Sequence, residues 1–316
     1  MKKPIRYKYI NLLLRFIIGV VAVWFIYKKL NTNFIDNLNQ IDITDLNWSL
    51  ILLTISLLFV NWGMEAIKWR FAIRGIEKIT ISKAFKLTLT GITIGLLTPN
   101  RIGEIPARAL LLNKGLFKEI ALKTTVSSFS QVIITFLLGG LGLILTQKYF
   151  KLGLDSLFLN AIVLISLMVL LTLYFRVNKL TPIFKKIRIL KNQELVNALL
   201  DFQFIELFTL LIFSFLRYIV FFLQYWLILQ AFGVELNSVG EILLIPVCFL
   251  FASSIPTILI SEIGVRGSVA LFVFGVVSDM EIQIVLASIT LWLINVAIPV
   301  LIGLFNLKEL KLLKEK

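Results

Sequence analysis

The sequence predicts an all-α integral membrane protein, and two observations carry that prediction. Of its 316 residues, 59% are hydrophobic and the mean hydropathy is +0.93, whereas a soluble domain has roughly 45–50% apolar residues. Apolar stretches of the roughly 20 residues that a helix needs to cross a bilayer recur along the chain. We therefore expect a single polytopic domain over residues 1–316 with no soluble domain.

Six of these stretches are continuous and are expected to cross the membrane fully. They lie near residues 10–27, 48–67, 122–146, 156–175, 205–231 and 282–304. The first resembles a signal peptide, but Trp24, Phe25 and Tyr27 stand where a small-residue cleavage site would follow. We expect an uncleaved span with an aromatic belt at its outer end.

Two further apolar regions, 82–118 and 240–278, are interrupted in the middle by proline, glycine and charge. Each is expected to form a broken helical hairpin, re-entrant or short, whose arms enter and leave from the same side. Proline in particular cannot continue a helix. The expected breaks are Pro99, Gly103, Pro106, Pro256 and Gly264.

Lysine and arginine are distributed unevenly between alternate segments. With the N-terminus taken as cytoplasmic, the inside segments carry 23 of them and the outside segments carry four. Because basic residues collect in cytoplasmic loops, this predicts a multi-pass protein of the cell (inner) membrane with both termini in the cytoplasm. The first hairpin then opens to the cytoplasm and the second to the outside. The same rule explains the net charge of +14, so no nucleic-acid partner is expected.

The two halves of the chain, 1–150 and 151–316, align when shifted by about 158 residues, which places Glu104 on Glu262. Each half has an odd number of crossings, so the second would be inverted relative to the first. Inverted repeats with paired interrupted segments are typical of membrane transport folds, with the site at the repeat interface. The alternative is a coincidence of spacing.

Both interruptions carry a Glu-x-x-x-Arg spacing. TPNRIGEIPAR contains Glu104 and Arg108, and PTILISEIGVR contains Glu262 and Arg266. Such a pair lies on one helical face and is neutral overall, so it costs less at membrane depth than either charge alone. Two interpretations stay open. The pairs pin the hairpins to the bundle, or the broken backbone lines a polar cavity, since irregular backbone in a bilayer must be covered by protein or wetted.

Arg217 stands mid-way through LFTLLIFSFLRYIVFFLQYW, too central to reach the interface easily. It is expected either to pair with Glu104 or Glu262 or to contact an anionic ligand. No lysine is expected at this depth. Glu65 and Lys68, in NWGMEAIKWR, are expected at the cytoplasmic interface, outside any site.

Several kinds of chemistry are excluded by composition. The chain has no histidine and one cysteine, Cys248, which removes His-based catalysis and His or Cys metal clusters. Prenyl transfer with Mg²⁺ would need clustered aspartates, and none lie in the apolar stretches. We predict no catalytic residue, no metal site and no cofactor.

At these motifs the chain resembles a known family. TPNRIGEIPARALLL is similar to the first signature of the lysylphosphatidylglycerol synthase transmembrane region, a flippase-like membrane family, and EAIKWRFAI resembles the helix end that precedes it. PTILISEIGVRGSVALFVFG resembles the second signature, with Glu262 where a glycine is common and Gly267 where an acid is common. The resemblance implies a lipid-handling membrane domain.

In the family's bifunctional resistance factors, this domain moves aminoacylated phosphatidylglycerol and precedes a soluble aminoacyl-transferase domain. This sequence ends at KELKLLKEK, so synthase activity is not expected.

We expect a lipid translocator that recognises an anionic phospholipid or polyprenyl phosphate. A phosphate head group would be held by Arg101, Arg108, Arg217 and Arg266. Glu104 and Glu262 would balance these charges, leaving an excess of two positive charges, and could carry a proton or bind a cationic head group. The alternatives are a non-transporting anchor in an envelope lipid pathway and, less favoured without histidine, an intramembrane lipid-modifying enzyme.

Overall fold

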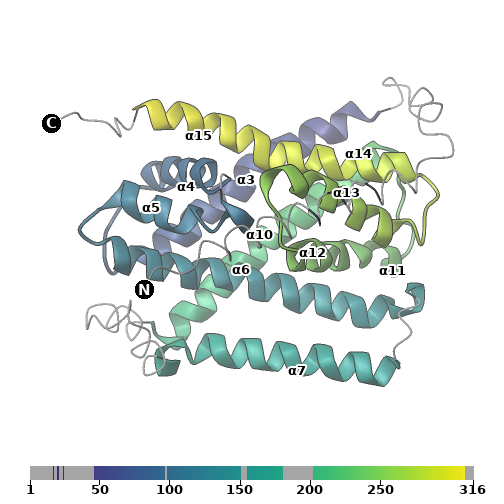
Figure 1. Cartoon of the computed structure of the whole chain (residues 1–316), viewed down its shortest axis with the longest axis horizontal. Coiled ribbons are helices and arrows are strands. Elements are labelled where there is room, and N and C mark those ends of the chain that lie inside the picture. The colour runs from purple at the N-terminus through teal and green to yellow at the C-terminus, as the bar shows by residue number, and fades with distance from the viewer. Residues whose placement is uncertain are drawn as a thin grey trace.

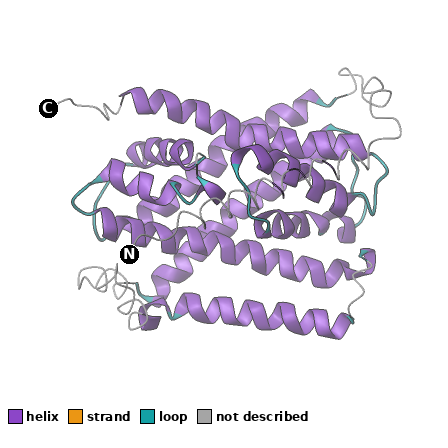
Figure 2. Cartoon of the chain, in the orientation of Figure 1, coloured by secondary structure: helices purple, strands orange, loops and turns teal. Residues whose placement is uncertain are grey.

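The structure, a computed structural model, describes residues 46–96, 98–150, 155–180 and 202–309, together with Ile17, Val20 and Trp24. Over these residues the regular structure is entirely helical (Figure 2). The predicted all-α membrane fold is confirmed. The expected first span, 10–27, lies almost wholly outside the described residues.

Five helical segments are long and apolar enough to cross a membrane. They are α3 (Trp48–Ile73), α6 (Phe117–Thr146), α7 (Ser156–Phe175), α10 (Phe204–Ala231) and a rod in which α14 (Glu281–Trp292) and α15 (Ile298–Glu309) are joined by π-helical Leu293–Ala297. Short 3₁₀ turns follow α6 at Gln147–Tyr149 and α7 at Val177–Leu180. In Figure 1, α6 and α7 lie side by side and α10 crosses obliquely behind α6. These segments match five of the predicted spans.

The two interrupted regions form broken hairpins. The first contains α4 (Ile81–Gly95), a 3₁₀ turn at Pro99–Arg101 and α5 (Glu104–Leu112). The second contains α11 (Val239–Ile242), α12 (Leu244–Ser254) and α13 (Leu259–Phe274). Their main arms, α4, α5, α12 and α13, have nine to 16 residues, or about 14–24 Å at 1.5 Å per residue, which is shorter than the roughly 30 Å hydrocarbon layer. The hairpins open toward opposite ends of the molecule, the first to the left and the second to the right in Figure 1.

The tips of the two hairpins contact each other directly. The Asn100 backbone N–H donates to the Thr257 carbonyl oxygen at 3.1 Å, and the Thr257 N–H donates to Asn100 Oδ1 at 2.7 Å. Asn100 and Arg101 both have left-handed backbone, with φ of 49° and 56°. Asparagine tolerates this conformation better than most residues. The turn therefore directs the backbone of one hairpin onto that of the other.

Three of the five predicted breaks lie where the hairpins turn. Pro99 and Gly103 bracket the first tip, and Pro256 lies in the extended link before α13. Pro106 does not break a helix, because it lies in the first turn of α5, where its missing N–H costs no helical hydrogen bond. The prediction for Gly264 is wrong, because this residue lies inside α13. A glycine costs only about 1 kcal/mol relative to alanine inside a helix, which is too little to interrupt a packed one.

Each hairpin packs on a long helix of the other half of the chain, α4 on α15 and α12 on α6. Glycines in α6 permit the second contact, because a Cβ at Gly139 would lie 2.5 Å from Leu250 Cβ and one at Gly142 would lie 3.1 Å from the Leu243 oxygen. Small residues allow such close helix packing in membranes. In an inverted repeat, the hairpin of each half is expected to pack on a long helix of the other half, as α4 and α12 do here. The two-fold relation between residues 1–150 and 151–316 stays a prediction.

Candidate functional site

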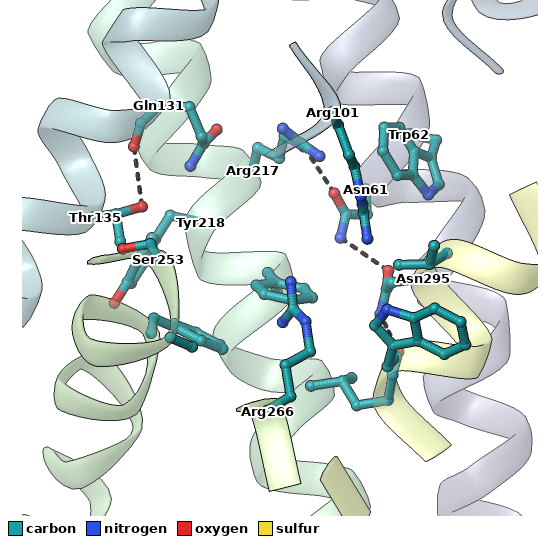
Figure 3. A pocket seen from close by; sticks show the side chains of 16 residues that line it. Asn61, Trp62, Arg101, Gln131, Thr135, Arg217, Tyr218, Ser253, Arg266 and Asn295 are labelled. Carbon is teal, nitrogen blue, oxygen red and sulfur yellow. Dashed lines mark hydrogen bonds between the residues drawn. The ribbon is translucent and has the colours of Figure 1, made fainter. Parts of the chain in front are cut away.

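A cavity of about 220 Å³ lies where the hairpin tips meet the long helices. Arg101 reaches it from the first hairpin, Arg266 from α13 and Arg217 from α10. Figure 3 shows Arg101 and Arg266 approaching from opposite sides toward a common space, with Arg217 beside Arg101. A second cavity of about 200 Å³ shares Arg101 and Arg266 and extends along the hairpin tips to Glu262. The two arginines thus line both spaces.

The first group of charges, which we call the tip cluster, consists of Arg101, Glu262 and Arg266. Arg101 Nη2 donates to Glu262 Oε1 at 2.6 Å, and Arg266 Nε donates to the same oxygen at 3.0 Å. The two arginine side chains keep 21% and 30% of their surface exposed, against 10% for Glu262. One carboxylate therefore serves two guanidinium groups, and the tip cluster carries one excess positive charge.

The second group, the buried cluster, consists of Glu65, Lys68, Glu104, Arg108 and Arg217. Glu65 is its centre. Its Oε1 accepts from Arg108 Nη1 at 3.0 Å, and its Oε2 accepts from Arg217 Nη1 at 2.9 Å and pairs with Lys68 Nζ at 2.8 Å. Arg108 also donates to Glu104 through Nη2. The side chains of Arg108 and Lys68 are only 1% exposed. Three cations face two carboxylates, so this cluster also carries one excess positive charge.

A network of side-chain amides fixes the orientation of Arg217. Arg217 Nε donates to Asn61 Oδ1 at 2.8 Å, and Asn61 Nδ2 donates to Gln224 Oε1 at 3.0 Å and to Asn295 Oδ1 at 3.1 Å. Asn295 lies in the π-helical segment that interrupts the α14–α15 rod, a distortion often found at functional sites. Trp62 stacks on the guanidinium, with its ring centroid 4.9 Å from Arg217 Cζ. Arg217 is therefore held in place while its side chain remains 19% exposed.

The structure brings the predicted residues together in two places. Both Glu-x-x-x-Arg spacings form ion pairs, Glu104 with Arg108 and Glu262 with Arg266. Arg101, Arg217 and Arg266 line the larger cavity and Glu262 lines the smaller one, whereas Glu104 and Arg108 line neither. Arg217 pairs with neither of the acids expected for it, because Glu65 lies closer.

The structure places two residues of α3 in the buried cluster, which the sequence did not predict. Glu65 and Lys68 were expected at the interface, and no lysine was expected among the deep charges, yet Glu65 is 4% and Lys68 1% exposed inside the buried cluster. The sequence does hold a clue, because Asn61, Glu65 and Lys68 follow at i, i+4 and i+7 and so share one helical face. The predicted excess of two positive charges nevertheless survives, since Glu65 and Lys68 cancel each other.

The chemistry that this arrangement can perform is anion binding. Three guanidinium groups converge on one cavity, and arginine's planar fork suits phosphate and carboxylate. Among the described residues, no three His, Cys, Asp or Glu side chains are grouped so that they could hold a metal ion.

Comparison with known families shows which family the chain belongs to. It matches the profile described as "Lysylphosphatidylglycerol synthase TM region" over residues 12–303. The chain belongs to this family. Comparison with curated proteins gives no match. The matched region includes both hairpins and all residues of the two clusters, and the family is one of multi-pass membrane proteins related to lipid handling.

Proposed function

We propose that the protein translocates a lipid with an anionic phosphate head group between the leaflets of the cell membrane. The observation that supports this most directly is the convergence of Arg101, Arg217 and Arg266 on one cavity, flanked by two clusters that each carry an excess positive charge. Burying charge without compensation is costly, and an anionic head group would supply the missing compensation.

The cavity arginines have hydrogen-bonding capacity left for a ligand. Each guanidinium carries five N–H donors. The side-chain hydrogen bonds described above engage one donor of Arg101, two of Arg217 and one of Arg266. Phosphate oxygens accept from such donors in pairs.

The position of the cavity favours translocation over simple surface binding. Two hairpins from opposite ends meet beside it, as in transport folds whose sites lie near the bilayer midplane between broken helices. A space of about 220 Å³ is smaller than the 300–1,000 Å³ typical of drug-sized ligand sites. It suits a head group, while the acyl tails would stay in lipid.

Glu104 and Arg108 have a different role in this proposal from the one that the sequence suggested. Because they lie off both cavities and Arg108 bonds to both Glu104 and Glu65, we assign them to fixing the first hairpin on α3. The phosphate-binding role falls to Arg101, Arg217 and Arg266, with Glu262 balancing them.

The test is lipid exchange in proteoliposomes. Acyl-labelled fluorescent phosphatidylglycerol becomes accessible to dithionite when it moves to the outer leaflet, so we expect the protein to increase the bleached fraction beyond that of empty vesicles. Arg217→Gln should fold, since Glu65 keeps Arg108 and Lys68, but should abolish most of this exchange. Arg74→Gln is the matched control, because Arg74 is 52% exposed and pairs with Glu206 away from the cavity.

The non-transporting anchor is the competing function. It predicts that wild type, Arg217→Gln and empty vesicles give the same bleached fraction for every anionic lipid tried. That result would remove translocation from consideration.

We also propose that the end carrying Lys83, Lys114 and Lys118 faces the cytoplasm, because basic residues collect there. In a Cys248→Ser background, a cysteine replacing Asp279 at the opposite end should react with an impermeant thiol reagent in intact cells. A cysteine replacing Asn113 should react only after the membrane is opened. Labelling of both, or of Asn113→Cys alone, in intact cells would contradict this orientation.

A further inference from the structure

The ion pair between Arg101 and Glu262 joins the two hairpins. Arg101 belongs to the 3₁₀ turn of the first hairpin and Glu262 to α13 of the second, and Arg101 Nη2 lies 2.6 Å from Glu262 Oε1. Beside this pair, the Asn100 and Thr257 backbones are joined by the two hydrogen bonds described above. The ion pair thus adds a charged bond to the neutral ones that hold the tips together.

The carboxylate of Glu262 occupies donors that an anionic head group would need. Its Oε1 accepts from both Arg101 and Arg266, and these two arginines line both cavities. Carboxylate and phosphate oxygens accept hydrogen bonds from a guanidinium group in the same way. A group tethered in the same molecule also acts at a high effective concentration. A head group that approaches Arg101 therefore competes with Glu262.

The geometry of α13 allows this competition to end without an unpaired carboxylate. Glu262 and Arg266 are four residues apart in one helix, so helix geometry keeps them together whatever Arg101 does. Arg101 lies 161 residues from Glu262 in the sequence and reaches it only through tertiary structure. If a phosphate binds Arg101, Glu262 keeps Arg266. A singly charged phosphodiester would also cancel the excess positive charge of the tip cluster.

The backbone of the first tip has a conformation that its contacts must maintain. Asn100 and Arg101 have φ of 49° and 56°, and this left-handed region disfavours arginine more than asparagine. Residues in such conformations persist where the surrounding structure holds them, and they cluster at ligand clamps and switch regions. Here the bonds to Thr257 and Glu262 hold the turn. Loss of the ion pair should therefore loosen it.

We propose that Glu262 is an internal competitor of the ligand. In the empty protein it binds Arg101 and keeps the hairpin tips together. An anionic head group takes over Arg101, breaks the ion pair between the hairpins and loosens the tips. A ligand shifts a conformational equilibrium only by interacting differently with the two states, and Arg101 supplies that difference. This rests on the proposed function and adds how binding is coupled to the hairpins.

Binding of radiolabelled phosphatidylglycerol to the purified full chain, in phosphatidylcholine nanodiscs, tests the competition. Glu262→Gln keeps the size of the side chain and an acceptor but removes the charge. It should bind the lipid roughly three- to tenfold more tightly than wild type, the effect of weakening one or two hydrogen bonds. Glu262→Asp keeps the charge but is too short to hold both arginines. It should also bind more tightly, by a smaller factor, and it decides the question if Glu262→Gln does not fold.

Glu206→Gln is the matched control for the loss of a carboxylate. Glu206 pairs with Arg74, whose side chain is 52% exposed, and neither residue lines a cavity described here. This variant should bind phosphatidylglycerol as wild type does.

Hydrogen exchange measures the effect on the tips. The N–H groups of Asn100 and Thr257 both donate across the tip contact, so their exchange reports its opening. Adding phosphatidylglycerol to wild type should raise deuterium uptake in the peptides that contain these residues, whereas a ligand that only rigidifies its site would lower it. Glu262→Gln should show raised uptake without the lipid, and Glu206→Gln should not.

The outcomes separate the inference from the function on which it rests. Unchanged or weaker binding by the folded Glu262 variants, or lower uptake at the tips when the lipid is added, would overturn the inference and leave an anionic-lipid site. Absence of binding by wild type and by every variant would overturn the proposed function as well. Soluble glycerol 3-phosphate should compete weakly. If it competes as well as the lipid does, the occupant is a free phosphate ester and the lipid assignment is wrong.

Discussion

The two hairpins carry the same Glu-x-x-x-Arg spacing in different surroundings. Arg108 is 1% exposed and bonds to two carboxylates, Glu104 and Glu65, away from both cavities. Arg266 is 30% exposed, shares Glu262 with Arg101 and lines both cavities. One local motif therefore anchors a hairpin in the first half of the chain and faces the candidate ligand space in the second. The number of carboxylates per arginine distinguishes the two situations.

The largest expected effect comes from removing the centre of the buried cluster. Glu65→Gln leaves Arg108, Arg217 and Lys68 with Glu104 as the only carboxylate of the cluster. Breaking a buried ion pair in this way costs about 3–5 kcal/mol, which should appear as a large drop in the midpoint of unfolding in detergent and in the yield of folded protein.

Glu206→Gln is the matched control for this change. Glu206 pairs with Arg74, whose side chain is 52% exposed, and exposed pairs contribute about 1 kcal/mol or less. If Glu65→Gln and Glu206→Gln lower the midpoint equally, the buried cluster does not stabilise the fold as described.

A comparison of the two motif arginines should separate anchoring from binding. Arg108→Gln leaves Glu104 and one oxygen of Glu65 without their partner, and should cost about 1.5–3 kcal/mol of unfolding free energy. Arg266→Gln leaves Glu262 bonded to Arg101 and should cost about 1 kcal/mol or less, because its environment is partly open. Unfolding midpoints measure this difference.

Lipid binding should show the opposite order. Among the folded molecules, Arg108→Gln should keep the affinity for phosphatidylglycerol, and Arg266→Gln should lose it. Equal loss of affinity in both variants would mean that the two hairpins are functionally equivalent and that the contrast in exposure has no consequence.

The last expected effect concerns the contact between the tips. Asn100→Gly keeps the left-handed backbone accessible but removes the Oδ1 that accepts from the Thr257 N–H, and should cost about 1 kcal/mol. Asn100→Ala should cost about 1–2 kcal/mol more, because alanine also disfavours φ of 49°. If alanine is tolerated as well as glycine, the tip does not depend on its left-handed turn.

Much of the architecture followed from local rules that act within one segment. The length of apolar runs predicted α7 at 156–175, and the structure has Ser156–Phe175. Proline located both hairpin turns, since a missing N–H and a fixed φ act wherever the residue stands. The i,i+4 spacing predicted the two Glu–Arg pairs because helix geometry alone brings those side chains together.

The contacts between distant segments depended on which helical faces meet. That is decided by the packing of all helices at once. Glu65 acquired partners 43 and 152 residues away, Arg108 and Arg217, so its place at the centre of a charge cluster was not predicted although its position in the helix was. Asn295 meets Asn61 across 234 residues through a π-helical segment that no apolar pattern indicates. The sequence by itself thus determined the spans, the broken hairpins and the charge excess. Only the tertiary structure decided which arginines are fully paired with carboxylates and which line the cavity. The reason is that an ion pair between distant segments forms only where packing brings their side chains within bonding distance.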